Sequence, residues 1–235
     1  WRCSEILWYS REERSHLLPN KSKLTMSYLL KVDVSPFGGN STSLNLGNAF
    51  VKAFSAANPN VEVRVRDLSA NPLPHLDGEA ISAGYVPEEG RSNGQASKHQ
   101  LRLDLIKEIA EAKSVVITVP LWNWSIPSVL KAYVDHIVLI GALDPYTNRK
   151  LAGKKVTIFI GTGGGYGPGS PHPEWEFITP YLTHIFTSLG SEDVQVIRAE
   201  FSMAGVAPGM ESLIPTKEKS LADGIAAAEA RAASI

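Results

Sequence analysis

Cysteine is almost absent from this chain of 235 residues, in which Cys3 is the only one. A single cysteine excludes a disulfide framework within the chain and a metal site built from several thiolates, and it fits a reducing compartment. A dominant charge is absent as well, because 23 Lys and Arg stand against 24 Asp and Glu. This balance gives no reason to expect nucleic acid or an anionic membrane as a partner, and it favours a small molecule or cofactor.

Long hydrophobic runs are also missing. No apolar stretch approaches the roughly 20 residues of a membrane span, and the N-terminus lacks the apolar core of a signal peptide, so we expect a cytoplasmic protein. The histidines show no spacing typical of a metal site, and we expect most of them to be surface or capping residues: His75, His99, His136, His172 and His184. The sequence predicts no metal centre.

Short apolar runs alternate with helical periodicity along most of the chain. Strands are predicted at residues 28–34, 61–65, 114–119, 154–161 and 194–199. Helices are predicted at residues 44–56, 95–112, 127–138, 175–189 and 216–234. This alternation predicts an α/β fold of three layers, with helices on both faces of a five-stranded parallel sheet and the flavodoxin-like strand order 2-1-3-4-5 as the leading candidate.

Two segments stand outside this alternation. Residues 71–94 are rich in Pro, Gly and acids, and we expect them to form a long loop. Residues 1–25 are polar, charged and without clear periodicity, and Met26 follows them directly before the first strand. We therefore interpret residues 1–25 as an N-terminal extension and residues 26–235 as one domain.

The segment Pro120–Pro127 (PLWNWSIP) joins the third predicted strand to its helix. In an open parallel sheet such a loop lies at the carboxyl ends of the strands, where ligands bind. Trp122 or Trp124 could cover a planar ring, and Asn123 offers donors and an acceptor to a ring edge such as that of an isoalloxazine. The alternative is that both tryptophans are core or interface residues and that Asn123 only turns the chain.

The loop from Ser35 to Ser43 follows the first strand and contains hydroxyl and amide side chains but no Lys or Arg. Backbone N–H groups at a helix N-terminus, together with the helix dipole, can hold a phosphate without a cation, and Asn40 or Ser41 suits the N-cap. The alternative is a capped helix after a flexible turn. Because the P-loop lysine is missing, hydrolysis of a nucleoside triphosphate is disfavoured.

A glycine-rich segment, Gly161–Gly169 (GTGGGYGPG), follows the fourth strand. It does not match G-x-G-x-x-G and no helix follows it directly, so a Rossmann dinucleotide fold is poorly supported. Its three central glycines would let the backbone approach a flat ring edge, with Thr162 and Tyr166 beside it. The pattern G-x-S-x-G at Gly90–Gly94 lies in the polar insert and not after a buried strand, which disfavours a hydrolase.

With these loops placed, the chain resembles the FMN-dependent NADH-azoreductase and NAD(P)H:quinone oxidoreductase family of flavodoxin-like enzymes from about Met26 to its C-terminus. The resemblance rests on the serine loop, on Pro120–Pro127 with LKAYVD behind it, on Thr162–Tyr166, on TPYL at 179–182 and on AE at 199–200. It implies bound FMN, NADH or NADPH as co-substrate, quinones and azo compounds as acceptors, and a homodimer.

By this resemblance, the serine loop would hold the FMN phosphate, and residues 121–124 and 162–166 would border the isoalloxazine. The cofactor-binding residues implied are Ser35, Ser41, Thr42, Ser43, Pro120, Leu121, Trp122, Asn123, Trp124, Thr162, Gly163, Gly164, Gly165 and Tyr166. No catalytic side chain is named, because the flavin carries the hydride chemistry in such enzymes. Many relatives have Tyr and Phe at the positions of the two tryptophans and often serine at that of Thr162, so we expect a reshaped pocket.

The sequence thus predicts an FMN-dependent oxidoreductase that takes hydride from NADH or NADPH and reduces quinones and azo compounds. Because no separate dinucleotide motif is present, both substrates should use one flat slot in turn, which predicts ping-pong kinetics. The alternative is an FMN-binding electron carrier or regulatory flavodoxin without nicotinamide turnover. The strong acidity usual in such carriers is absent here.

Overall fold

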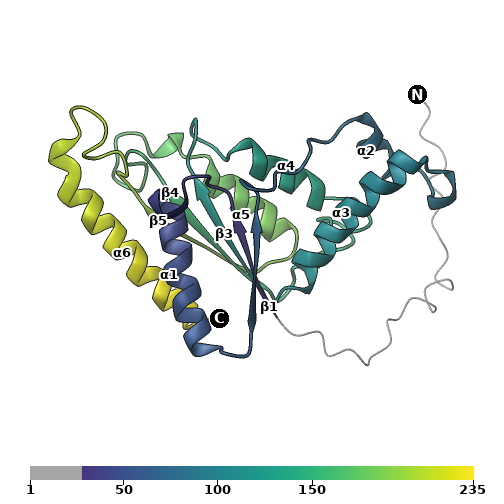
Figure 1. The fold of residues 1–235 in the computed structure, drawn as a ribbon, viewed down its shortest axis with the longest axis horizontal. Helices are drawn as coiled ribbons and strands as arrows, with labels where there is room; N and C mark the ends of the chain where they lie inside the picture. Colours follow the sequence, from purple (N-terminus) through teal and green to yellow (C-terminus); the bar gives the residue numbers. More distant parts are fainter. Residues whose placement is uncertain (1–27) are drawn as a thin grey trace.

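The computed structural model describes residues 28–235, and the extension predicted at residues 1–25 lies outside them. Its centre is a single parallel sheet in the order β2-β1-β3-β4-β5 (Figure 1). The strands are β1 Tyr28–Asp33, β2 Glu62–Asp67, β3 Ser114–Pro120, β4 Lys155–Gly161 and β5 Asp193–Ala199. The predicted fold class and strand order are confirmed.

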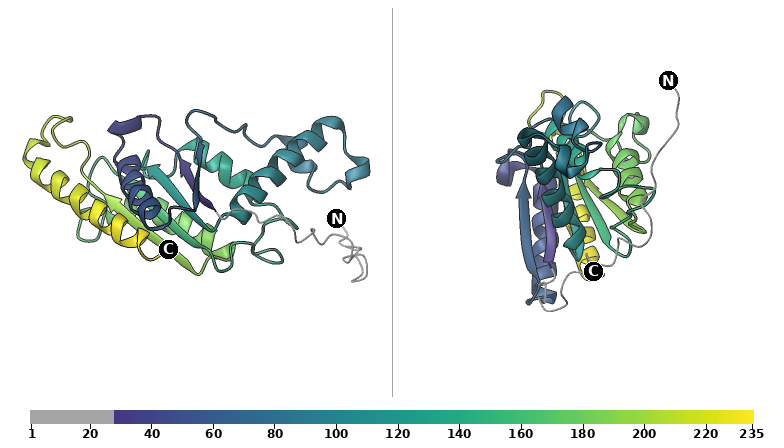
Figure 2. Two further views of the ribbon diagram at one scale, coloured as in Figure 1. Left: turned by 60° about the horizontal axis from the view of Figure 1, so that its bottom comes forward. Right: turned by 90° about the vertical axis from the view of Figure 1, so that its right-hand side faces the viewer.

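Helices cover both faces of this sheet. The α-helices are α1 Thr42–Ala57, α2 Gly78–Ser82, α3 Asn93–Glu111, α4 Ser128–Ile137, α5 Ile178–Ser188 and α6 Ile214–Ala232. α1 and α6 pack side by side on one face, whereas α3, α4 and α5 cover the other (Figure 1). The N-terminal part of α3 and the short α2 project beyond the sheet, away from α6 (Figure 2). Among the described helices, none is both long and apolar enough to cross a membrane.

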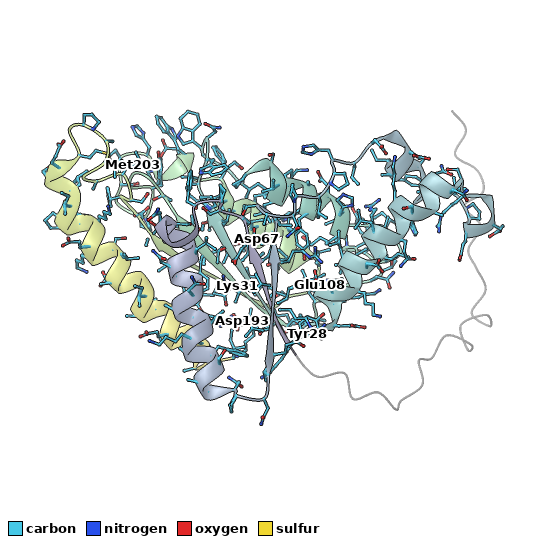
Figure 3. All side chains as sticks on the ribbon, viewed as in Figure 1. Tyr28, Lys31, Asp67, Glu108, Asp193 and Met203 are labelled. Carbon is cyan, nitrogen blue, oxygen red and sulfur yellow. The ribbon has the colours of Figure 1, made fainter. Side chains whose placement is uncertain are left out.

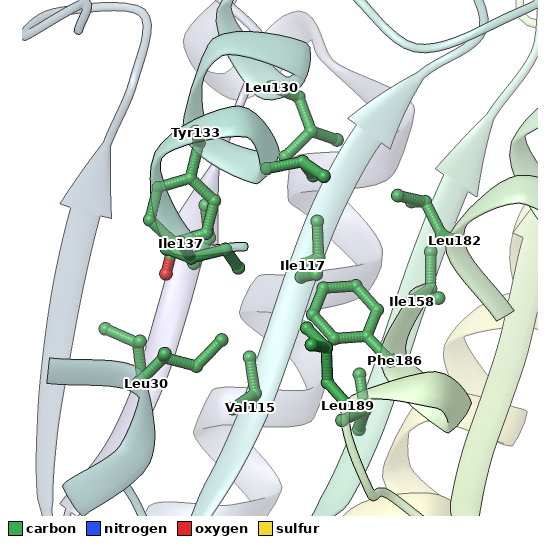
Figure 4. Close-up of a cluster of buried hydrophobic side chains, with 14 of the residues drawn as sticks. Leu30, Val115, Ile117, Leu130, Tyr133, Ile137, Ile158, Leu182, Phe186 and Leu189 are labelled. Atoms are coloured by element: carbon green, nitrogen blue, oxygen red, sulfur yellow. The ribbon is translucent and has the colours of Figure 1, made fainter. Parts of the chain in front are cut away.

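The two apolar cores lie on the two faces of β3. Val115 and Ile117 point into the larger core under α3, α4 and α5, while Val116 points into the smaller core under α1 and α6. Ile117 lies among side chains of α4 and α5, such as Leu130 and Phe186 (Figure 4). A strand buried on both faces explains the continuous β-branched run in its sequence. Each such side chain contributes about 1.5–3 kcal/mol when fully buried.

The insert at residues 71–94 is not the plain loop that its composition predicts. It contains α2, and α3 already begins at Asn93. The Asp77 carboxylate caps α2, and Ser92 caps α3 in a capping box with Gln95. Ser92, the serine of the G-x-S-x-G pattern, therefore stabilises a helix end, which agrees with the argument against a hydrolase.

The helix predicted from Trp175 begins later, at Ile178, and residues Pro173–Trp175 form a separate 3-10 turn. The reason is the buried Glu176, whose carboxylate accepts the N–H groups of Ile178 and Thr179 at 2.6 and 2.8 Å. A carboxylate bound to first-turn N–H groups fixes the start of a helix. The predicted boundary is corrected accordingly.

His136 is an exception to the expectation that most histidines are surface or capping residues, because it is only 2 % exposed. Its Nε2 lies 2.8 Å from the carbonyl oxygen of Pro74 and so ties the insert to α4. Beside it, the buried Arg102 of α3 donates to the carbonyls of Asp135, His136 and Val138 at 3.2, 3.2 and 2.8 Å. Burial lowers the pKa of Arg102 from its ordinary value. This cation caps the C-terminus of α4, which follows the aromatic loop.

Candidate functional site

A cavity of about 480 Å³ opens at the carboxyl edge of the sheet, where the loops after β1, β3, β4 and β5 meet. None of its lining residues has an ionisable side chain. The lining comprises Ser35, Phe37, Asn40, Ser41, Thr42, Ser43, Pro120, Leu121, Trp122, Gly161, Gly163, Ser202, Met203 and Val206. The three loops singled out from the sequence therefore do meet at one cavity, and a fourth loop joins them.

The first turn of α1 forms the polar end of the cavity. Ser41 has extended backbone and is the N-cap, with its Oγ accepting the N–H of Leu44 at 3.4 Å. The Ser43 hydroxyl lies 3.2 Å from that of Ser41, and both side chains are buried. The first-turn N–H groups of Thr42 and Ser43 have no acceptor inside the helix. Hydroxyls and free N–H groups thus gather at the positive end of the α1 dipole.

The end of β4 touches this first turn because Gly161 has no side chain. A Cβ added to Gly161 would lie 2.8 Å from the Ser43 nitrogen and 3.1 Å from the Thr42 Cβ. The carbonyl of Gly161 also accepts the N–H of Leu121 at 2.9 Å, which fixes the start of the aromatic loop. The polar and aromatic walls of the cavity are therefore joined through one glycine.

The aromatic loop makes a tight turn at its tip. Trp122 and Ser125 exchange two backbone hydrogen bonds of 3.1 and 3.0 Å across Asn123 and Trp124. Asn123 and Trp124 have φ values of 47° and 67°, the left-handed pair that a type I′ turn requires. Sequence rules do not predict a tryptophan there, because a Cβ disfavours this conformation.

The turn sends the two tryptophans to different places. The Trp122 ring lines the cavity and meets Phe37 edge-on, with centroids 6.3 Å apart. Trp124 instead packs edge-on against Trp175 at 5.7 Å, and neither Trp124 nor Asn123 belongs to the lining. The position of Trp122 fits the interpretation that a tryptophan of this loop covers a ligand ring, because Trp122 borders the cavity. The position of Trp124 fits the alternative of a packing residue, because Trp124 packs on another ring.

Within the predicted stretch Thr162–Tyr166, only Gly163 lines the cavity. Thr162 is buried, and its hydroxyl donates to the Gly164 carbonyl at 2.6 Å, which holds the loop in shape. Gly165 packs under the ring of Phe201, and Tyr166 lines a different hollow beside α5. These residues support the wall more than they form it.

The loop between β5 and α6 is the wall that sequence reasoning missed. It contributes Ser202, Met203 and Val206 to the lining. Met203 lies at the same edge as the other loops, at the opposite end of the sheet from Asp193 at the start of β5 (Figure 3). No motif marks these residues, and the only available signal is their position after a strand that neighbours β4.

A buried ion pair lies on β1 just before the serine loop. Lys31 Nζ is 2.6 Å from Asp33 Oδ2, and the Thr118 hydroxyl donates to Asp33 Oδ1 at 2.8 Å. Both charged side chains are buried and satisfied by each other. Because the charges cancel within one pair, they leave the neighbouring cavity without a net charge of either sign.

Comparison with known proteins places the chain in a family. Residues 27–223 match a family model described as the flavodoxin-like fold. A protein of Frankia alni named FMN-dependent NADH:quinone oxidoreductase is 37% identical over 210 residues, which cover 88% of this chain and 100% of the relative. The chain belongs to the FMN-dependent NADH:quinone oxidoreductase family. A member from Streptomyces avermitilis is 35% identical over 208 residues, covering 88% and 96%. The predicted family is confirmed.

Solved structures agree with this family in fold. An azoreductase from Bacillus anthracis str. Sterne superimposes with a TM-score of 0.78 at 23% identity, covering 89% of this chain and 100% of that one. An FMN-dependent NADH-azoreductase from Bacillus anthracis str. Ames Ancestor, in complex with FMN, gives 0.75 at 22% identity, covering 88% and 99%. At these identities the likeness shows the shared fold.

The residues around the cavity fit FMN. The lining includes one helix N-terminus, that of α1, which with the Ser41 and Ser43 hydroxyls suits one phosphate without a cation. Pro120, Leu121 and Trp122 form an apolar wall beside it, suited to a planar ring. The volume lies within the roughly 300–1,000 Å³ usual for small-molecule sites. One helix N-terminus in the lining suits the single phosphate of FMN better than the two of FAD.

Proposed function

We propose that this protein uses FMN to take hydride from NADH or NADPH and to reduce quinones, and azo compounds as well. The observation that carries the proposal is one uncharged cavity that joins the α1 N-terminus to the flat wall at Trp122. Relatives at 35–37% identity that carry the name FMN-dependent NADH:quinone oxidoreductase support it.

In this proposal the phosphate is held by the hydroxyls and first-turn N–H groups of Ser41, Thr42 and Ser43, with Ser35 beside them. Leu121 and Trp122 would contact the isoalloxazine, and Gly163 would lie beside it. Asn123, Trp124, Thr162, Gly164, Gly165 and Tyr166 stay predictions as flavin contacts, because none of them lines the cavity.

When bound, FMN supplies the hydride chemistry. The protein binds the phosphate, orients the ring against Trp122 and keeps water from one side of it. Since none of the lining side chains is ionisable, we assign no acid or base among them.

Both substrates should enter by the same opening. Four apolar side chains, those of Phe37, Trp122, Met203 and Val206, line the cavity and are 40–68 % exposed. A nicotinamide and a quinone are both flat, and either would occupy this slot in the absence of the other. We therefore propose ping-pong kinetics, in which the oxidised nicotinamide leaves before the acceptor binds.

Steady-state oxidation of NADH and NADPH, with and without a quinone and an azo dye, tests the function. We expect turnover that depends on the acceptor, parallel double-reciprocal lines, and inhibition by excess quinone that is competitive with NADH. An FMN-loaded protein without nicotinamide turnover would instead be an electron carrier. Intersecting lines, with a ternary complex trapped by a dead-end quinone analogue, would refute the single slot.

A homodimer is also part of the proposal. Three exposed aromatic side chains gather beside the site, namely Trp124, Trp175 and Phe177. The Trp124 ring contacts that of Trp175, and the Trp124 carbonyl accepts the N–H of Phe177 at 3.0 Å. Such a cluster is typical of an interface. Light scattering should report twice the chain mass, and a fully active monomer would contradict this. A cytoplasmic location stays a prediction from the sequence.

A further inference from the structure

The glycine loop (Thr162–Tyr166) and the β5–α6 loop (Glu200–Val206) form one hydrogen-bonded unit. Three consecutive N–H groups of the β5–α6 loop, from Phe201 to Met203, donate to the carbonyls of Gly164, Thr162 and Gly163 at 3.3, 3.0 and 3.2 Å. Because Ser202, Met203 and Gly163 line the cavity, a shift of either loop would move a wall of the site.

The centre of the glycine loop consists of three glycines, so few side chains of its own hold this loop in place. Gly163, Gly164 and Gly165 have no Cβ, and glycine has more conformational freedom than any other residue. The loop therefore needs an anchor at its far end, next to Tyr166. The Thr162 hydroxyl fixes its near end, through the bond of 2.6 Å to the Gly164 carbonyl.

Glu200 supplies that anchor. Its Oε1 accepts the Tyr166 N–H at 2.7 Å, and its Oε2 would lie 3.0 Å from a Cβ added to Gly167. The backbone N–H of Glu200 donates to the Ser220 hydroxyl of α6 at 2.9 Å, which fixes the residue from behind. A carboxylate that accepts a backbone N–H makes a short hydrogen bond, about twice as strong as a neutral one.

The next residue, Phe201, is strained. Its φ is 62°, a left-handed conformation that a side chain with a Cβ disfavours. Its ring covers Gly165 so closely that a Cβ there would lie 2.4 Å from the ring. Strained residues persist only where the surroundings fix them, and here the carboxylate on one side and three backbone bonds on the other do so.

We propose that Glu200 is a positioning residue of the cofactor site, which holds the glycine loop against the cavity through the Tyr166 N–H. The inference rests on the proposed function, because it assigns the glycine loop to the edge of the bound flavin. Glu200 itself does not line the cavity, so it acts through the backbone that it holds.

Glu200→Ala and Glu200→Gln separate this role from general stability. The alanine variant loses the acceptor, and we expect about tenfold weaker FMN binding together with altered absorption and fluorescence of the bound flavin. The glutamine variant keeps an amide oxygen at the same place and should recover most of the affinity. Gly167→Ala, which crowds the Glu200 carboxylate, should change the flavin spectrum in the same direction.

Asp144→Ala is the matched control. The Asp144 carboxylate also accepts backbone N–H groups, those of Gly141, Tyr146 and Thr147, but in a loop that does not line the cavity. This variant should lower the melting temperature and leave the flavin spectrum and FMN affinity unchanged.

The outcomes are distinct. If wild-type protein binds FMN and Glu200→Ala, like Asp144→Ala, lowers only the melting temperature, the inference is overturned and the proposed function stands. If Glu200→Ala does not fold, an unchanged flavin spectrum in Gly167→Ala overturns it in the same way. Wild-type protein that binds no FMN after reconstitution overturns the proposed function and this inference together.

Discussion

Replacing Gly161 by alanine tests whether the contact between β4 and α1 makes the phosphate end of the cavity. The new Cβ would lie 2.8 Å from the Ser43 nitrogen and 3.1 Å from the Thr42 Cβ, and both neighbours belong to the helix. The first turn of α1 must move, and overpacking of this kind costs about 1–3 kcal/mol of unfolding free energy. Because the Ser43 N–H is a proposed phosphate donor, FMN affinity should also fall about tenfold or more.

Gly39→Ala is the control for this variant. Gly39 lies in the Ser35–Ser43 loop before α1, but a Cβ there meets nothing within 4 Å and its backbone is not left-handed. Urea denaturation measures the unfolding free energy, and titration of the apoprotein with FMN, followed by flavin fluorescence, measures the affinity. We expect Gly39→Ala to behave as wild type in both. A Gly161→Ala protein with wild-type stability and FMN affinity would refute the proposed phosphate site.

Three further predictions have expected outcomes of different kinds. Trp122→Ala should weaken FMN binding or turnover by an amount on the order of 1–3 kcal/mol. Trp124→Ala, whose side chain does not line the cavity, should change FMN affinity less. Equal losses of affinity for both variants in FMN titrations would contradict this prediction. Tyr133→Phe should raise the unfolding free energy by about 1 kcal/mol, since the buried Tyr133 hydroxyl has no hydrogen-bond partner among the described residues. A clear loss of unfolding free energy in urea denaturation would show instead that the hydroxyl has a hydrogen-bond partner. Burial alone would raise the pKa of Asp144, but backbone N–H groups of residues 141–147 hold that pKa below its ordinary value. The carboxylate therefore stabilises the fold above about pH 4, its ordinary pKa, and the melting temperatures of wild type and Asp144→Asn should converge only as the pH falls below that value.

Strand prediction was most accurate where burial alone decides the pattern. β3 and β4 were predicted to within one residue, because strands covered on both faces are continuous apolar runs. β2 was predicted to end at Val65 but continues to Asp67. As an edge strand it carries Arg64 and Arg66, and Glu108 of α3 holds Arg66 through two hydrogen bonds of 2.5 and 2.9 Å. A cross-element ion pair of this kind leaves no periodic signal in the sequence.

In the candidate site, too, some features follow from local sequence patterns and others depend on the tertiary structure. The serine and aromatic loops were recognisable because their residues are adjacent in the chain. The wall formed by Ser202, Met203 and Val206 depends on β5 lying beside β4, which a local pattern does not contain. The S-x-x-Q spacing at Ser92 is a local signal for its capping role, which the prediction of a long loop at residues 71–94 missed. The short α2 was not readable from the sequence, because its five residues bury only Ala80 and so show no periodicity.

Backbone strain is concentrated beside the cavity. Within residues 28–235, the residues other than glycine with left-handed backbone are Asn123, Trp124 and Phe201, all in the loops after β3 and β5. This conformation costs roughly 1–2 kcal/mol for a residue with a Cβ, although asparagine tolerates it better. The strain turns Trp124 away from the cavity while Trp122 stays in its wall, and it lays the Phe201 ring over Gly165. Glycine in place of Trp124 or Phe201 would relax the backbone, but it would also remove an aromatic ring that packs beside the loop. The residues that support the site are therefore those whose conformation residue propensity predicts least well.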